Sequence, residues 1–208
     1  MVLPLGRLRD LGDRGTLPGV PKLRITYNAP VILTFTLAAV FVFVITSVAP
    51  GLRAWFVAYP KLGDVHAYVG LFGHILAHES WAHLLSNFML ILLIGPMLEE
   101  RRGSATLFVM ILVTALVTGL VNLFSDHALI GASGVAFMMV LLASMANVRS
   151  GDIPLTFIAV AVIYMGGEIA QSFQTDHVSH LSHLVGGAVG AVFGFLMTGD
   201  KKRKRTTG

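Results

Sequence analysis

A serine hydroxyl and a histidine imidazole, each beside glycines, are the side chains of this sequence best suited to covalent chemistry. Ser133 lies in the sequence G-A-S-G at 131–134, and His183 lies in H-L-S-H-L-V-G at 180–186. A serine hydroxyl becomes a useful nucleophile when a neighbouring base accepts its proton. The small residues around Ser133 leave space for a substrate backbone to approach. If the two side chains meet, they form a dyad for acyl transfer.

Acyl transfer also needs hydrogen-bond donors for the oxyanion that forms in the transition state. His83 and Asn87 are four residues apart, which is about 40° around a helix, so they share a face. Both side chains can donate, and the backbone N–H of Ser133 is a third candidate. Loss of one such donor typically costs about 3–4 kcal/mol of transition-state stabilisation. This pair is therefore expected to line an oxyanion site.

Each of these residues also has a structural interpretation. A serine in a transmembrane helix commonly bonds its own backbone, and Asn87 could join two helices. His183 could be a packing residue, and His180, one turn higher, is an alternative base that lacks the three-residue spacing to Gly186. The matching position of a serine and a histidine near the starts of two apolar stretches favours the catalytic interpretation.

A metal site or a catalytic triad fits the sequence less well. His78-Glu79 resembles the start of a zinc motif, but His83 follows five residues later, about 140° around a helix and on a different face. Asp126 and Asp176 could orient an imidazole, although their place in polar connectors favours solvation. We expect no metal and no cofactor. Glu168, inside an apolar stretch, has no assigned role.

The composition indicates a membrane protein. Of the 208 residues, 55% are hydrophobic and 12% are charged, and there is no cysteine. A soluble domain carries about 25% charged residues, so lipid is the solvent that suits this chain. The absence of cysteine excludes disulfides, thiolate catalysis and Cys-ligated metals.

Six apolar stretches have about the length that crosses a bilayer. We expect an all-α fold: a compact bundle of six transmembrane helices in one domain at 29–199, after an N-terminal segment at 1–28 and before a basic tail at 200–208. The six expected spans are 30–49, 81–99, 105–125, 129–147, 153–171 and 179–198.

The basic residues give the expected orientation. Thirteen of the fifteen Lys and Arg residues fall on one side of six spans, and only Arg53 and Lys61 fall on the other. Basic residues mark the cytoplasmic side, so both termini are expected in the cytoplasm, with the plasma membrane as the location. The tail at 201–205 is interpreted as an anchor on an anionic leaflet, so no nucleic-acid partner is expected.

This topology places the candidate residues at one depth. The second, fourth and sixth spans run from outside to inside, and Ser133 and His183 each lie about four residues into a span, or roughly 6 Å below its start. Gly186, Gly190 and Gly194 form a small-residue stripe that lets another helix pack closely. Close packing of the fourth and sixth spans would join the dyad.

Three motifs, taken together, resemble the rhomboid family of intramembrane serine proteases over roughly residues 30–198. They are an H-x4-H-x3-N run from His78 to Asn87, the G-x-S-G motif, and an H-x2-G-x3-G run from His183 to Gly190. The resemblance implies a six-helix protease that cuts transmembrane segments of other proteins. It is further supported by Leu98-Glu99 with Gly103, which look like the family's turn after its second core helix.

The resemblance also implies a role for individual residues. Ser133 would be the nucleophile and His183 the general base, with His83 and Asn87 in the oxyanion hole. The resemblance further implies that His78 supports the outer loop and that Phe137 lies against the catalytic imidazole. The other expected site residues follow from small size and spacing: Gly131 beside the substrate, and Gly186 and Gly190 in helix packing.

Two rival functions remain open. A non-catalytic relative that binds transmembrane segments would be expected to lack Ser133 or His183, and both are present. A proton or metal transporter would need polar groups that continue toward the cytoplasmic side, whereas the inner halves of the second, fourth and sixth spans are almost wholly apolar.

Overall fold

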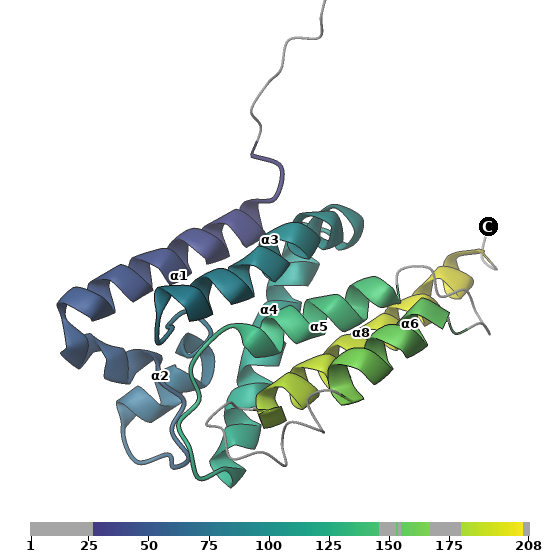
Figure 1. Ribbon diagram of the computed structural model, residues 1–208. Coiled ribbons are helices and arrows are strands. Elements are labelled where there is room, and N and C mark those ends of the chain that lie inside the picture. Colours follow the sequence, from purple (N-terminus) through teal and green to yellow (C-terminus); the bar gives the residue numbers. More distant parts are fainter. Residues whose placement is uncertain (1–26, 146–152, 154, 167–179, 206–208) are drawn as a thin grey trace, which may run out of the picture.

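The computed structural model describes residues 27–145, 153, 155–166 and 180–205, and within these ranges the chain is an all-helical bundle (Figure 1). Within these ranges, Ala58 and Leu129 form an isolated antiparallel β-bridge. The main helices are α1 (Pro30–Val48), α2 (Val65–Gly73), α3 (Trp81–Arg102), α4 (Ser104–Val121), α5 (Ser133–Ser144), α6 (Leu155–Val160) and α8 (His180–Arg205).

Each expected span overlaps a helix in the described residues, although parts of the expected spans 129–147 and 153–171 lie outside them. The helix α1, the helix α3 and the stretch Ser104–Phe124 are long and apolar enough to cross a membrane. The stretch Ser104–Phe124 includes the short helix η3 (Asn122–Phe124) after α4. The apolar parts of α5 and α8 are shorter, and α6 continues as a π-helical segment, η4 (Ala161–Met165). The chain is therefore a polytopic bundle of apolar helices, as its composition predicts.

The helices α1, α3 and α4 are joined at one end of the bundle by the carboxylate of Glu99. This side chain is 2% exposed and accepts hydrogen bonds from the backbone N–H groups of Val31 and Ile32, each at 3.0 Å. It also accepts one from the Ser104 hydroxyl at 2.7 Å. The first N–H groups of a helix lack intrahelical acceptors, and the helix dipole favours negative charge there. Glu99 therefore caps α1 from a distant part of the chain.

The connector between α1 and α3 is structured, which the hydropathy pattern did not predict. It contains a 3-10 helix, η2 (Pro50–Phe56), and the short helix α2, whose first turn is capped by Asp64 through the Ala67 N–H at 3.0 Å. Ala58 then pairs with Leu129 through two backbone hydrogen bonds of 3.0 and 2.9 Å. The connector is thereby attached to the segment that precedes α5.

The helices α5 and α8 lie side by side and run in the same direction (Figure 1). A Cβ atom at Gly186 would collide with the backbone carbonyl of Gly134, and one at Gly190 would collide with that of Met138. The two backbones therefore approach more closely than any side chain would allow. This contact is the one predicted from the spacing of the glycines in α8.

We predict that Glu99→Ala lowers the stability of the bundle by about 3 kcal/mol or more, because a hydrogen bond to a charged group is worth about 1.5–3 kcal/mol. Glu99→Gln is expected to lose less, since its amide oxygen can still accept. Thermal unfolding in detergent measures the effect. Ser104→Ala removes one of the bonds to Glu99 and serves as the graded control. Equal melting temperatures for wild type and Glu99→Ala would contradict the assigned role.

Candidate active site

Ser133 is the first residue of α5, four residues later than the predicted start of the span. The reason is tertiary, because residues 129–132 are held in a loop by bonds from the connector between α1 and α3, called the outer connector from its expected side of the membrane. The N–H of Leu129 donates to Ala58, and the N–H of Gly131 donates to the His74 carbonyl at 2.9 Å. Gly131 has a φ of +117°, a backbone conformation that glycine adopts readily and other residues rarely do. The loop therefore places Ser133, which is half-buried, at the first position of α5 between the buried residues Ala132 and Gly134.

His183 lies in the first turn of α8, against the same part of α5. Its ring stacks on that of Phe137 with the centroids 4.6 Å apart and the planes within 7° of parallel. Phe137 is one turn after Ser133, so both project from one face of α5. Near the same level, a Cβ at Gly134 would lie 3.3 Å from the Ser182 carbonyl oxygen. The structure thus brings His183 to the face of α5 that carries Ser133.

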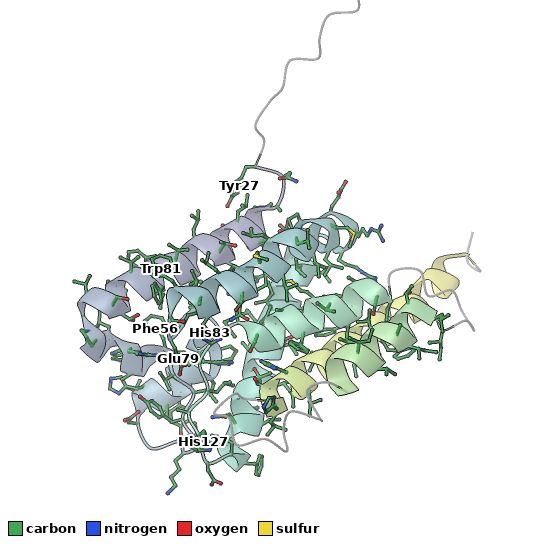
Figure 2. The ribbon with its side chains drawn as sticks, in the orientation of Figure 1. Tyr27, Phe56, Glu79, Trp81, His83 and His127 are labelled. Carbon is green, nitrogen blue, oxygen red and sulfur yellow. The ribbon has the colours of Figure 1, made fainter. Side chains whose placement is uncertain are left out.

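The two predicted oxyanion residues come from the first turns of α3. Ser80 caps this helix by accepting the His83 N–H at 3.1 Å, which fixes where α3 begins and so where His83 lies. A Cβ at Gly131 would lie 2.7 Å from His83 Cε1 and 3.6 Å from Asn87 Nδ2. Both side chains therefore lie next to the backbone of Gly131, two residues before the serine, and Figure 2 shows His83 near Glu79.

The Asn87 side chain has a buried hydrogen-bond donor with no acceptor among the described residues. The side chain is 6% exposed, and its Nδ2 atom has no hydrogen-bond partner among the described residues. A buried donor without an acceptor costs about 1–3 kcal/mol. Such a cost is expected where the acceptor arrives with the substrate. The geometry around Gly131 is consistent with a site for an oxygen.

His78 connects the outer connector to the loop before Ser133. It is 3% exposed, and its Nε2 atom accepts the N–H of Ala132 at 3.3 Å. Its ring lies edge-on to those of His83 and Phe88, with centroid distances of 5.0 and 5.7 Å. Burial, with a smaller contribution from His83, lowers the pKa of His78 to about 4. At neutral pH the imidazole is therefore uncharged and Nε2 can accept.

His74 is a contributor that sequence reasoning did not single out. Its side chain is buried, with Nδ1 3.0 Å from the Gly70 carbonyl and Nε2 3.2 Å from the Thr118 hydroxyl, and its carbonyl binds Gly131. Burial lowers the pKa of His74 to about 4. Its four-residue spacing from His78 could have pointed to it. Spacing alone, however, does not tell a buried histidine from an exposed one.

The remaining candidates have varied positions. The ring of His180 lies 6.4 Å from that of His183 and nearly perpendicular to it, so it neighbours the site without displacing His183 from Phe137. Asp126 is exposed in the outer loop, as its sequence position suggested. Asp176 and Glu168 lie outside the described residues.

Comparison with known proteins gives a family match over much of the chain. A family model, the Rhomboid domain, matches residues 65–200. The chain belongs to the rhomboid family. The resemblance predicted from the three motifs is thereby confirmed, and the chain is an integral membrane protein and a serine protease of this family.

Individual rhomboid proteins support the assignment over much of the chain. Rhomboid protease GlpG of Haemophilus influenzae is 29% identical over 64% of this chain and 70% of its own length. Rhomboid protease GlpG of Pectobacterium atrosepticum is 25% identical over 85% of this chain and 66% of its own length. Rhomboid-related protein 1 of Caenorhabditis elegans is 30% identical over 72% of this chain. The match spans 44% of that longer relative.

Replacing Gly186 with alanine is predicted to separate the starts of α5 and α8. The added Cβ would meet the Gly134 carbonyl, and overpacking of this kind costs about 1–3 kcal/mol. A displacement near 1 Å at reacting groups can reduce turnover about 100-fold, so we expect cleavage to fall at least 10-fold. Gly51→Ala is the control because a Cβ there meets nothing within 4 Å. Equal cleavage by both variants would contradict the packing argument.

The two buried histidines predict acid-sensitive stability. Their folded pKa values of about 4 lie below the ordinary value of 6.5, so between these values the unfolded chain binds more protons than the folded one. Stability therefore rises with pH in this window and is lost as pH falls from about 6.5 to about 4. The melting temperature should follow this trend, and the double variant His74→Gln/His78→Gln should flatten it. An unchanged slope in the double variant would disprove the assignment.

Proposed function

We propose that the chain hydrolyses peptide bonds in or near transmembrane segments of other membrane proteins through a dyad of Ser133 and His183. The observation that carries the proposal is the stacking of His183 on Phe137, 4.6 Å between centroids, one helical turn from Ser133. Close packing of α5 and α8 at Gly134 and Gly186 supports it. An imidazole held flat against an aromatic ring is fixed in orientation, which a general base requires.

The proposed reaction proceeds in two stages. The Ser133 hydroxyl oxygen attacks the carbonyl carbon while His183 accepts the hydroxyl proton. His183 then returns this proton to the leaving amine as the C–N bond breaks, giving an acyl ester on Ser133. Water, deprotonated by His183, attacks the ester and releases the acid and the free serine. The dyad needs neither a carboxylate partner, nor a metal, nor a cofactor.

The oxyanion is proposed to bind between Gly131 and the first turns of α3. Asn87 offers a buried Nδ2 donor that no described residue occupies, and the His83 ring lies against the Gly131 backbone. The N–H of Ser133 is a third donor, since the first N–H groups of a helix have no intrahelical acceptor. Together these groups could hold the charge that develops on the substrate oxygen.

Substrate entry is proposed to be lateral, between α3 and α6. No described residue of α6 is buried, whereas α5 has eight buried residues. The exposed side of α3 is apolar, with Leu85, Met89 and Leu93 each more than half exposed. A substrate helix in the lipid could therefore reach this side of the bundle without crossing a polar surface. The helix must unwind locally before its backbone reaches Ser133.

The topology is proposed as six spans in one domain at 29–199, with the segment 1–28 and the basic tail both in the cytoplasm of a cell whose plasma membrane holds the protein. Glu99 and the neighbouring Arg101 and Arg102 lie at the inner end of α3, opposite the histidine-rich end. The helix α8 continues to Arg205, so at about 1.5 Å per residue its basic end lies roughly 30 Å from His180, about one hydrocarbon thickness.

The decisive experiment is incubation of the purified protein with a labelled transmembrane substrate in proteoliposomes. Ser133→Ala and His183→Ala are each expected to abolish cleavage, because loss of either dyad member removes about 10⁴-fold or more of the rate in serine proteases. His180→Ala is the matched control in the same helical turn and should retain most of the activity. Cleavage by Ser133→Ala at the wild-type rate would refute the proposal, and loss only in His180→Ala would reassign the base.

A further inference from the structure

The loop before Ser133 presents a series of backbone N–H groups, and the outer connector binds most of them. The N–H of Leu129 donates to the Ala58 carbonyl, and that of Gly131 donates to the His74 carbonyl. The N–H of Ala132 donates to His78 Nε2 at 3.3 Å. The next N–H along the chain belongs to Ser133.

The third of these bonds differs from the others because a side chain supplies the acceptor. Ala132 is the N-cap of α5, and no side-chain hydrogen bond caps this helix from the N-cap position itself. Alanine cannot act as a cap, since it has no side-chain acceptor. His78, which is 54 residues away in sequence, instead fixes the peptide that leads into the nucleophile.

We propose that His78 is a positioning residue that fixes the Ala132 peptide through its Nε2 atom, so that the hydroxyl and the N–H of Ser133 both face the substrate carbonyl. This inference rests on the proposed role of Ser133. His78 does not touch the substrate, because Ala132 lies between it and the nucleophile. Its contribution is to occupy one donor and orient the next.

Several contacts make His78 suitable for this task. The ring is held by edge-on contacts with His83 and Phe88, both in α3, the helix that also carries Asn87. One imidazole therefore links the two sides of the proposed oxyanion site. Burial keeps the ring uncharged at neutral pH, with a pKa of about 4, and in the neutral ring an accepting Nε2 places the proton on Nδ1.

A pair of substitutions isolates the Nε2 contact. His78→Gln places an amide group near the position of Nε2, where its oxygen can accept the Ala132 N–H. His78→Asn places its amide near Nδ1, too short to reach. We expect His78→Asn to reduce kcat about 10- to 100-fold with little change in KM, because the substrate contacts remain while the reacting groups are displaced. His78→Gln should stay within about threefold of wild type.

Hydrogen–deuterium exchange of the peptide covering 129–135 gives a readout independent of catalysis. Exchange should be faster in His78→Asn than in wild type, and His78→Gln should restore protection. His66→Gln and His66→Asn are the controls, since His66 lies in the same connector but pairs with Asp64 at 3.5 Å instead of with the loop. Neither control is expected to change exchange or kcat.

The outcomes separate this inference from the proposed dyad. Equal kcat and equal exchange for His78→Gln and His78→Asn would overturn the role of His78. A fall in melting temperature without a fall in kcat per folded molecule would also overturn it, since it would indicate a structural role alone. If Ser133→Ala still cleaved substrate, the dyad would fail, while the exchange data would still report whether His78 holds the Ala132 peptide.

Discussion

The close approach of two helix backbones is the constraint on which the candidate site depends. Serine and histidine have short side chains. Two helices that bring a serine hydroxyl to a histidine imidazole must therefore pack more closely than ordinary core side chains permit. At Gly186 the backbone of α8 lies against the Gly134 carbonyl, with no space for a Cβ. In lipid, where apolar burial between helices contributes little, such van der Waals contact is a main source of association. The glycines therefore provide both stability and the geometry of His183.

Close helix packing does not fix the loop that leads into Ser133, the proposed nucleophile, and the outer connector holds this loop. Ala58, His74 and His78 each bind one N–H of the segment at 129–132. In a membrane protein, unpaired backbone groups are costly unless they line a water-filled region. Three of the four N–H groups at 129–132 thus donate to acceptors elsewhere in the fold, and the N–H of Ser133, a proposed oxyanion donor, follows directly after them. The same backbone hydrogen bonds therefore contribute to both folding and the proposed chemistry.

Much of this arrangement follows from the sequence because its patterns are local. Apolar runs gave the first residues of α1 and α3 correctly but ended α3 three residues early, and the glycine spacing in α8 predicted its contact with α5. The start of α5 was placed four residues early, since residues 129–132 are apolar and only long-range bonds pull them from the helix. The cap that Glu99 gives to α1 was equally invisible, because no local signal links a carboxylate to N–H groups 67 residues earlier.

Tight packing around the nucleophile and access for a substrate make opposing demands on the bundle. A protease that cuts helices must admit both a peptide from the lipid and water from outside, yet hold its reacting groups to a fraction of an ångström. The chain separates these demands by element. The helices α3, α5 and α8 carry the proposed catalytic and oxyanion residues, whereas no described residue of α6 is buried. The proposed lateral entry requires a substrate to displace α6, which carries none of the proposed catalytic groups. Such a displacement would leave Ser133 and His183 on α5 and α8, whose contact at Gly134 and Gly186 does not involve α6.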